Sequence, residues 1–232
     1  MTADPPPDKR GIRSYVLRTG RITPSQKSAF DRHWHKYGLN LGDGEFNQQT
    51  VFPRKAPLVL EIGFGMGESL CAMAEQEPDK SFIGIEVHTP GVGRLLNDLA
   101  VGQIDNVRIY RDDAVAVLQQ CVADNSIARL QLYFPDPWPK KKHHKRRIVQ
   151  PAFVELAWKK LVPGGILHLA TDWQAYAEHM VDIIEGLESD RFTNIAGSKR
   201  FSPRPQYRPM TKFEQRGERL GHSVWDLLYQ KN

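Results

Sequence analysis

The sequence contains little cysteine and no long apolar run. Its 232 residues include two cysteines, and neither Cys71 nor Cys121 has a second thiol or a histidine at metal-ligand spacing. We therefore predict two buried free thiols, which excludes a disulfide framework and a zinc site. No eighteen apolar residues occur in succession, and the Pro- and Asp-rich start MTADPPPDKR lacks the basic end and apolar segment of a signal peptide. These absences predict a cytoplasmic protein that does not enter a membrane.

Positive charge is unevenly distributed along the chain. Residues 1–37 carry eight Lys or Arg against three acids, residues 194–232 carry the same numbers, and six more Lys or Arg lie within residues 140–147. The rest of the chain is acidic. Segregated positive charge indicates a polyanionic partner, with nucleic acid as the first candidate and an anionic membrane surface as the second.

From Leu58 onward, short apolar runs alternate with amphipathic stretches. This order predicts an α/β fold with a doubly wound, mostly parallel sheet and helices on both faces. The segments RFTNI and SVWDLLYQ are expected to form an antiparallel pair at one edge. The five strands that we predict for the parallel part are residues 58–62, 81–86, 107–111, 128–134 and 165–171.

The region before the sheet has the signature of a helix start. Thr23, Pro24 and Gln26 supply an N-cap, a first-turn proline and a capping-box glutamine, so a helix is expected at about 24–37. We divide the chain into a disordered tail (1–9), an N-terminal helical extension (10–50) and one domain (51–232).

Each predicted parallel strand delivers an acid near its carboxyl end, and in an open parallel sheet that rim is where ligands bind. A single acid there is also compatible with a helix N-cap or a solvated loop. Several together favour a site for a cationic ligand. In strand order these acids are Glu61, Glu86, Asp112 and Asp113, Asp136, and Asp172.

A glycine-rich loop, Gly63, Gly65 and Gly67, follows the first of these strands. A dinucleotide fingerprint would need a further glycine at position 68, but Glu68 stands there and would repel a diphosphate at the helix start. Together with Glu86, which is suited to hold ribose hydroxyls, the loop predicts an adenosine ligand without phosphates. S-adenosylmethionine is such a ligand and is cationic, whereas NAD is disfavoured.

Five blocks carry a family resemblance: LVLEIGFGMGESL, FIGIEVHTPGVGRLL, FPDPWPKKKHHKRR, ATDWQAY and RPMTKFEQRG. In this order, over roughly residues 10–230, they closely resemble the bacterial tRNA (guanine-N7-)-methyltransferase family of the TrmB type. The resemblance implies a class I methyltransferase (Rossmann-like) fold, S-adenosylmethionine as cofactor and tRNA as partner. It further implies methylation of N7 of the guanine at position 46 in the tRNA variable loop, with no obligatory protein partner.

The resemblance also implies roles for individual residues. The cofactor-contacting acids of the family match Glu61, Glu86, Asp113 and Asp136, and Asp136 also matches the residue with the catalytic role. Its substrate-contacting positions match Lys140, Asp172, Thr211, Lys212, Phe213 and Glu214, and its RNA-contacting segment matches Lys142, His143, His144, Lys145, Arg146 and Arg147. No metal is expected, since methyl transfer needs none.

The chemistry of guanine N7 restricts these roles. N7 carries a lone pair and no proton, so Asp136 is expected to stabilise developing positive charge rather than to act as a base. Asp172 or Glu214 is expected to accept the N1 and N2 donors of guanine, although Asp172 also suits a helix N-cap. Trp138 and Phe213 could stack on the base or anchor their loops.

Positive charge near the carboxyl terminus is a further candidate for phosphate contact. Arg200, Arg204 and Arg208 are expected to extend the RNA-binding track. Two alternatives to N7 methylation stay open: an S-adenosylmethionine-dependent RNA methyltransferase that acts on a base amine, and a non-catalytic RNA-binding protein.

Overall fold

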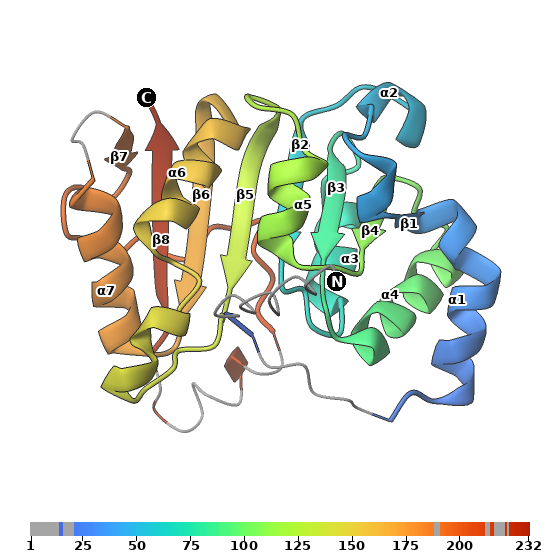
Figure 1. Cartoon of the computed structure of the whole chain (residues 1–232), viewed down its shortest axis with the longest axis horizontal. Helices are drawn as coiled ribbons and strands as arrows, with labels where there is room; N and C mark the ends of the chain where they lie inside the picture. The colour runs from blue at the N-terminus through green and yellow to red at the C-terminus, as the bar shows by residue number, and fades with distance from the viewer. Residues whose placement is uncertain (1–13, 16–20, 188–190, 212–213, 216–220, 222) are drawn as a thin grey trace, which may run out of the picture.

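The computed structural model describes residues 14–15, 21–187, 191–211, 214–215, 221 and 223–232. This part of the chain forms one sheet with the strand order β1-β4-β3-β2-β5-β6-β8-β7 (Figure 1). Strands β1 to β6 pair in parallel, and β8 and β7 add an antiparallel edge, as expected. The strands are β1 Gly38–Leu39, β2 Leu58–Ile62, β3 Ser81–Ile85, β4 Val107–Tyr110, β5 Ile127–Tyr133, β6 Leu161–Thr171, β7 Phe192–Asn194 and β8 Trp225–Lys231.

Helices cover both faces of the sheet because successive strand side chains point to opposite sides. Leu60 of β2 belongs to one buried apolar cluster and Val59 to the other. Helices α5 (Ala114–Gln120), α6 (Pro151–Lys160) and α7 (Gln174–Glu185) pack on the first face. Helices α1 (Pro24–Tyr37), α3 (Glu68–Gln76) and α4 (Thr89–Val101) pack on the second. The short elements are η1 Leu41–Asp43, α2 Gln48–Val51 and η2 Lys141–Arg146.

The expected N-terminal helix is confirmed as α1. The Thr23 side chain accepts from the Gln26 N–H, and the Gln26 side chain accepts from the Thr23 N–H, which forms the capping box. The strand that follows, β1, was not expected, because two residues carry no readable alternation. Gly38 and Leu39 pair with Ile109 and Tyr110 of β4, so the extension adds a strand to this edge of the sheet.

Strand β6 begins four residues earlier than the apolar pattern predicts, at Leu161 instead of Gly165. Its pairing with β5 shifts register between Ile127 and Arg129, where a bulge accommodates the sequence VPGG. Gly164 has a φ of 77°, which a residue with a side chain rarely adopts. The glycines therefore break the apolar pattern without ending the strand.

On the second face, the covering changes from helices to irregular chain at β5. Beyond α3, Tyr207, Arg208 and Glu214 lie over β5, β6 and β8, and Ser202 forms a bridge to Asp226 of β8. None of the helices in the described ranges is long and apolar enough to cross a membrane.

Candidate active site

A pocket of about 460 Å³ lies at the carboxyl ends of β2, β3, β4 and β5. This is the rim at which the acids were expected to meet. Its lining includes the predicted residues Gly63, Gly65, Glu86, Asp113 and Asp136, together with Asp112. Another hollow, of about 360 Å³, is lined by Ser81 and Asn106 at the amino ends of β3 and β4, away from these acids.

The glycine loop forms one wall of the pocket. Gly63 and Gly65 have φ angles of 75° and 59°, and a Cβ built on either would meet nothing within 4 Å, so the backbone itself faces open space. Gly67 does not line the pocket. Its φ is 82° at the start of α3, and a Cβ there would lie 2.8 Å from the Leu95 side chain, so this glycine allows α3 to pack on α4.

Glu86 holds the loop in place. Its Oε2 accepts from the Gly65 N–H at 2.8 Å, and its Oε1 accepts from the N–H groups of Val87 at 2.7 Å and His88 at 2.9 Å. A carboxylate offers about four acceptor positions, so Glu86 can still accept from a ligand hydroxyl. On α4, a Cβ at Gly91 would lie 1.9 Å from the carbonyl oxygen of Gly65, so only glycine permits this approach.

Asp113 combines a structural contact with a place in the pocket. Its Oδ1 accepts from the N–H groups of Val115 at 2.9 Å and Ala116 at 3.0 Å, which caps α5. Asp112 accepts from the Asp113 N–H through its own Oδ1. Both acids line the pocket, so the N-cap role and a ligand role are compatible here.

Glu61 differs from the other acids because it is buried in β2. Burial, reinforced by the nearby charge of Glu86 and opposed by Arg129, raises the pKa of Glu61 to about 8. Its Oε2 has no hydrogen-bond partner in the described part of the chain. Glu61 is not itself a lining residue, but the next residue, Ile62, is.

The loop that carries Asp136 has an unusual backbone. Phe134 and Trp138 have φ angles of 51° and 42°, and such values cost of order 1–3 kcal/mol each for residues with side chains. The Phe134 N–H donates to Ala170 at 2.8 Å and so continues the pairing of β5 with β6. Asp136 between them is exposed at the pocket, and its side chain makes no hydrogen bond to the described residues.

Trp138 anchors its loop rather than facing the pocket. Its indole N–H donates to the Ser14 carbonyl at 3.1 Å, and the Arg146 guanidinium stacks on its ring at 3.9 Å from the centroid. Of the two readings for Trp138, this geometry favours the anchor. Ser14 and Tyr15 also line the pocket, so the N-terminal extension contributes to the site.

The basic run forms the 3-10 helix η2, directly after the Asp136 loop. Lys140, Lys142 and Lys145 are exposed, and His143, His144 and Arg146 are partly exposed. Arg147 corrects the expectation for this segment. Only 3% exposed, it donates through Nε to the Pro137 carbonyl at 2.9 Å and lies over the Tyr176 ring, so it supports the loop from inside.

The expected substrate-contacting residues differ in exposure. Asp172 is partly exposed beside the first turn of α7, and the N-cap position belongs to Trp173, so Asp172 is not a helix cap. Glu214 is 3% exposed, and Arg208 and Thr211 occupy both of its carboxylate oxygens. Lys212 and Phe213 lie outside the described residues.

Two further expectations can be compared with the structure. Arg208 was expected to extend an exposed basic track, which is wrong, because it is 1% exposed, whereas Arg200 and Arg204 are exposed. Of the two thiols, Cys121 is buried and Cys71 is only partly buried.

The pocket fits a cationic adenosine ligand without phosphates. Five carboxyl groups lie in or beside it, one of them with a buried, unpartnered oxygen, and the loop presents backbone rather than side chains to the open space.

Residues 55–227 match the family described as putative methyltransferase. Proteins named tRNA (guanine-N(7)-)-methyltransferase are similar throughout. The one from Alcanivorax borkumensis is 59% identical over 96% of this chain and 92% of its own length, and that from Methylococcus capsulatus is 53% identical over 100% and 98%.

The chain belongs to the tRNA (guanine-N(7)-)-methyltransferase family. Solved structures support the methyltransferase fold. An rRNA methylase from Streptococcus thermophilus has a TM-score of 0.50 and 13% identity, covering 76% of this chain and 87% of its own. A putative methyltransferase from Streptococcus mutans, solved in complex with SAH, has a TM-score of 0.50 and 12% identity, covering 77% and 90%.

Sequence reasoning missed several groups of this methyltransferase. Ser14 and Tyr15 reach the pocket from a segment with no motif that would place them there. The partners of Glu214 were also missed, because Arg208 was assigned to the surface by charge alone. A signal did exist for Gly91, since a glycine one residue after a first-turn proline is a poor helix former and calls for a packing reason.

Proposed function

We propose that this protein transfers the methyl group of S-adenosylmethionine to N7 of the guanine at position 46 in the variable loop of tRNA. Asp136 carries the proposal. It lies at a pocket lined by backbone glycines and acids, and the exposed basic helix η2 begins five residues after it. Cofactor and polyanionic substrate would therefore meet along one continuous loop. High identity to the named relatives over nearly the whole chain supports this activity.

The pocket residues would divide the work of binding the cofactor. Glu86 would accept from the ribose hydroxyls, with Gly63, Gly65 and Asp113 around the adenosine moiety. The carboxyl of Glu61 is suited to a cationic group, because a nearby positive charge favours its ionised form. When bound, S-adenosylmethionine supplies an electrophilic methyl group on its sulfonium.

Asp136 would act electrostatically. Guanine N7 needs no deprotonation, so no general base is required, and the purine ring gains positive charge as the methyl group arrives. A carboxylate fixed beside the ring stabilises that charge. The two unusual φ angles that flank Asp136 hold it at the pocket, and most of the remaining rate acceleration comes from alignment of N7 with the methyl group.

Asp172 would read the guanine edge. Of the two candidates, Glu214 has both oxygens engaged and is 3% exposed, whereas Asp172 is accessible and has no side-chain hydrogen bond to the described residues. A carboxylate accepts from both N1–H and N2–H of guanine, but adenine lacks these donors. Lys140, Lys142 and Lys145 would contact phosphates and fix the orientation of the tRNA.

The deciding experiment uses unmodified tRNA and S-adenosylmethionine labelled in its methyl group. The labelled product is then cleaved chemically at 7-methylguanosine and mapped. We expect a single cleavage in the variable loop. Unlabelled tRNA would indicate a non-catalytic RNA-binding protein, and label on a base amine would assign a different methyltransferase class.

A further inference from the structure

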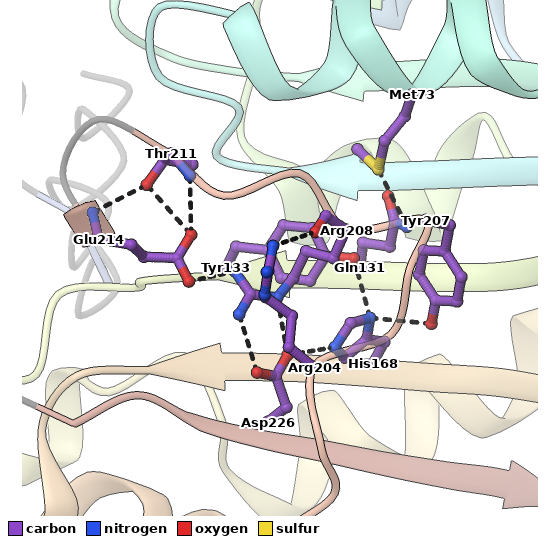
Figure 2. A network of polar contacts seen from close by, with 10 residues as sticks. All are labelled: Met73, Gln131, Tyr133, His168, Arg204, Tyr207, Arg208, Thr211, Glu214 and Asp226. Atoms are coloured by element: carbon purple, nitrogen blue, oxygen red, sulfur yellow. Dashed lines mark hydrogen bonds and ion pairs between the residues drawn. The ribbon is translucent and has the colours of Figure 1, made fainter. Parts of the chain in front are cut away.

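A buried arginine organises the polar cluster on the second face of the sheet (Figure 2). Arg208 is 1% exposed, and its guanidinium contacts Asp226 of β8 through Nε at 2.7 Å and Nη2 at 2.8 Å. Its Nη1 donates to Oε1 of Glu214 at 2.7 Å. Arg208 therefore forms a bidentate pair with the sheet and a single contact with the segment above it.

Through Glu214, this arginine reaches Thr211. Oε2 of Glu214 accepts from the Thr211 N–H at 3.0 Å and from its Oγ1 at 3.2 Å, and the Glu214 N–H donates back to Thr211 Oγ1 at 3.1 Å. The first and last residues of the expected substrate-contacting motif are thus fixed to each other. Arg208 is the residue that connects this pair to the sheet.

The same cluster reaches the strand that leads to Asp136. His168 of β6 is fully buried and donates through Nε2 to Asp226 Oδ1 at 2.8 Å. Its Nδ1 is then an acceptor with one lone pair, which the Tyr133 hydroxyl at 2.9 Å and the Tyr207 hydroxyl at 3.0 Å share. Tyr133 is the last residue of β5, three residues before Asp136.

We infer that Arg208 is a positioning residue that fixes Glu214, and through it Thr211, relative to the Asp136 loop, so that Thr211 and Asp136 reach one bound tRNA nucleotide. The inference rests on the proposed function. Glu214 then has a positioning role, through its contacts with Arg208 and Thr211, and does not contact the base. Thr211 carries the substrate contact.

A purely stabilising role is the alternative. A buried ion pair contributes little net stability compared with well-packed apolar residues, yet removal of one partner is strongly destabilising. Stability alone therefore does not explain why two carboxylates converge on one arginine, with a histidine held against one of those carboxylates. A need for fixed geometry between two separate segments explains this arrangement, because a misplacement of about 1 Å costs about 10²-fold in rate.

The test compares Arg208→Gln with the control Lys231→Met. Lys231 lies on the same strand as Asp226, is 5% exposed, and donates to the Leu161 carbonyl and to Asn125 Oδ1, both at 2.7 Å, at the amino end of β6. Both variants are expected to lower the melting temperature. The assays are run well below the melting temperature. There, Arg208→Gln should lose about tenfold or more in kcat/KM for tRNA, mainly through a higher KM, with the Kd for S-adenosylmethionine unchanged. Lys231→Met should keep the wild-type kcat/KM, KM and Kd.

A double-mutant cycle with Glu214→Gln distinguishes a positioning role of Glu214 from direct contact with the base. If Glu214 acts through Arg208, the double variant is no worse than Arg208→Gln, because both remove the same connection. If the two variants' losses in kcat/KM were additive in the double variant, the positioning role of Glu214 would be overturned. If Arg208→Gln does not fold, the isosteric Asp226→Asn replaces it in the assay and the cycle with the same expected pattern.

The outcomes distinguish this inference from the proposed function. A wild-type protein that labels tRNA, with an Arg208→Gln variant that melts earlier but keeps its tRNA kinetics, would overturn the inference alone. A wild-type protein that leaves tRNA unlabelled would overturn the proposed function and the inference together.

Discussion

The cofactor pocket and the polar cluster around Arg208, on two sides of the sheet's centre, hold their acids in different ways. On the side of β3 and β4, Glu86 and Asp113 accept from backbone N–H groups, mostly within three residues of themselves. On the side of β6 and β8, Asp226 and Glu214 are held by the side chain of Arg208, and Asp226 also by His168. The first side is built mostly from neighbouring residues, whereas the second also joins separate elements, such as β6 and β8 through His168 and Asp226.

This difference matters for what each side can recognise. Backbone N–H groups at a loop and a helix start hold a carboxylate rigidly at little entropic cost, which suits a small, constant cofactor. A folded RNA is larger and must be met by several segments at once. Side-chain contacts between segments fix their mutual positions, and the basic helix η2 lies outside them, exposed to phosphate.

The largest effect is expected at Asp136, where the two sides meet. We expect Asp136→Asn to lower kcat by about 10²–10³-fold, because the variant removes a preorganised charge opposite the developing cation. Binding of tRNA should be nearly unchanged in equilibrium titrations. Asp79→Asn is the control, since the Asp79 side chain is 75% exposed at a remote turn. Collapse of tRNA affinity in Asp136→Asn would contradict the electrostatic role.

The next largest effect is the pH dependence of stability that results from Glu61, on the cofactor side. Because the pKa of Glu61 is about 8 in the folded chain and 4.5 ordinarily, the folded state binds the extra proton between these values. Its contribution to stability is therefore complete below pH 4.5 and is lost as the pH rises to about 8, a change of a few kcal/mol. Glu61→Gln should flatten the melting temperature between pH 6 and pH 9. If the melting temperatures of the variant and the wild type changed with pH in parallel, the titrating group would be a residue other than Glu61.

The local side of the site could be predicted from the sequence for physical reasons. The glycine loop, the acids at the strand ends and the helix that Asp113 caps all depend on residues next to one another, and strand direction brings them to one rim. For the same reason β2 was predicted with its observed bounds, Leu58–Ile62.

The other side could not be predicted, because its partners are set by tertiary structure. Arg208 and Arg204 look alike in the sequence, yet Arg208 is buried against Asp226 and Arg204 is exposed. Arg147 likewise ends a basic run but faces inward. The run of charge gives no sign of this, since the direction of each side chain depends on the packing of β8 and α7 beneath it.

A smaller effect separates the two roles of Asp113. Asp113→Ala removes the N-cap of α5 and the pocket charge together, so we expect a loss of about 1 kcal/mol in the free energy of unfolding and a weaker Kd for S-adenosylmethionine. Asp113→Asn keeps a capping oxygen and should retain stability within a few tenths of a kcal/mol, but the Kd should still weaken. Denaturant titration and calorimetry measure the two quantities. An unchanged Kd in Asp113→Asn would assign Asp113 to the helix alone.

The smallest effect compares an exposed and a buried cation of the same basic run. Lys142→Ala should weaken tRNA binding a few-fold and reduce the slope of log K against log salt by about 0.7–0.9, the value for one lost phosphate contact. Arg147→Met should leave the slope unchanged and lower the melting temperature, because Arg147 donates to the Pro137 carbonyl inside the loop. Binding measured between 50 and 200 mM salt distinguishes them, since only a cation that displaces counterions from RNA contributes to the slope. An equal decrease of the slope in Arg147→Met would mean that this guanidinium leaves the Pro137 carbonyl when tRNA binds.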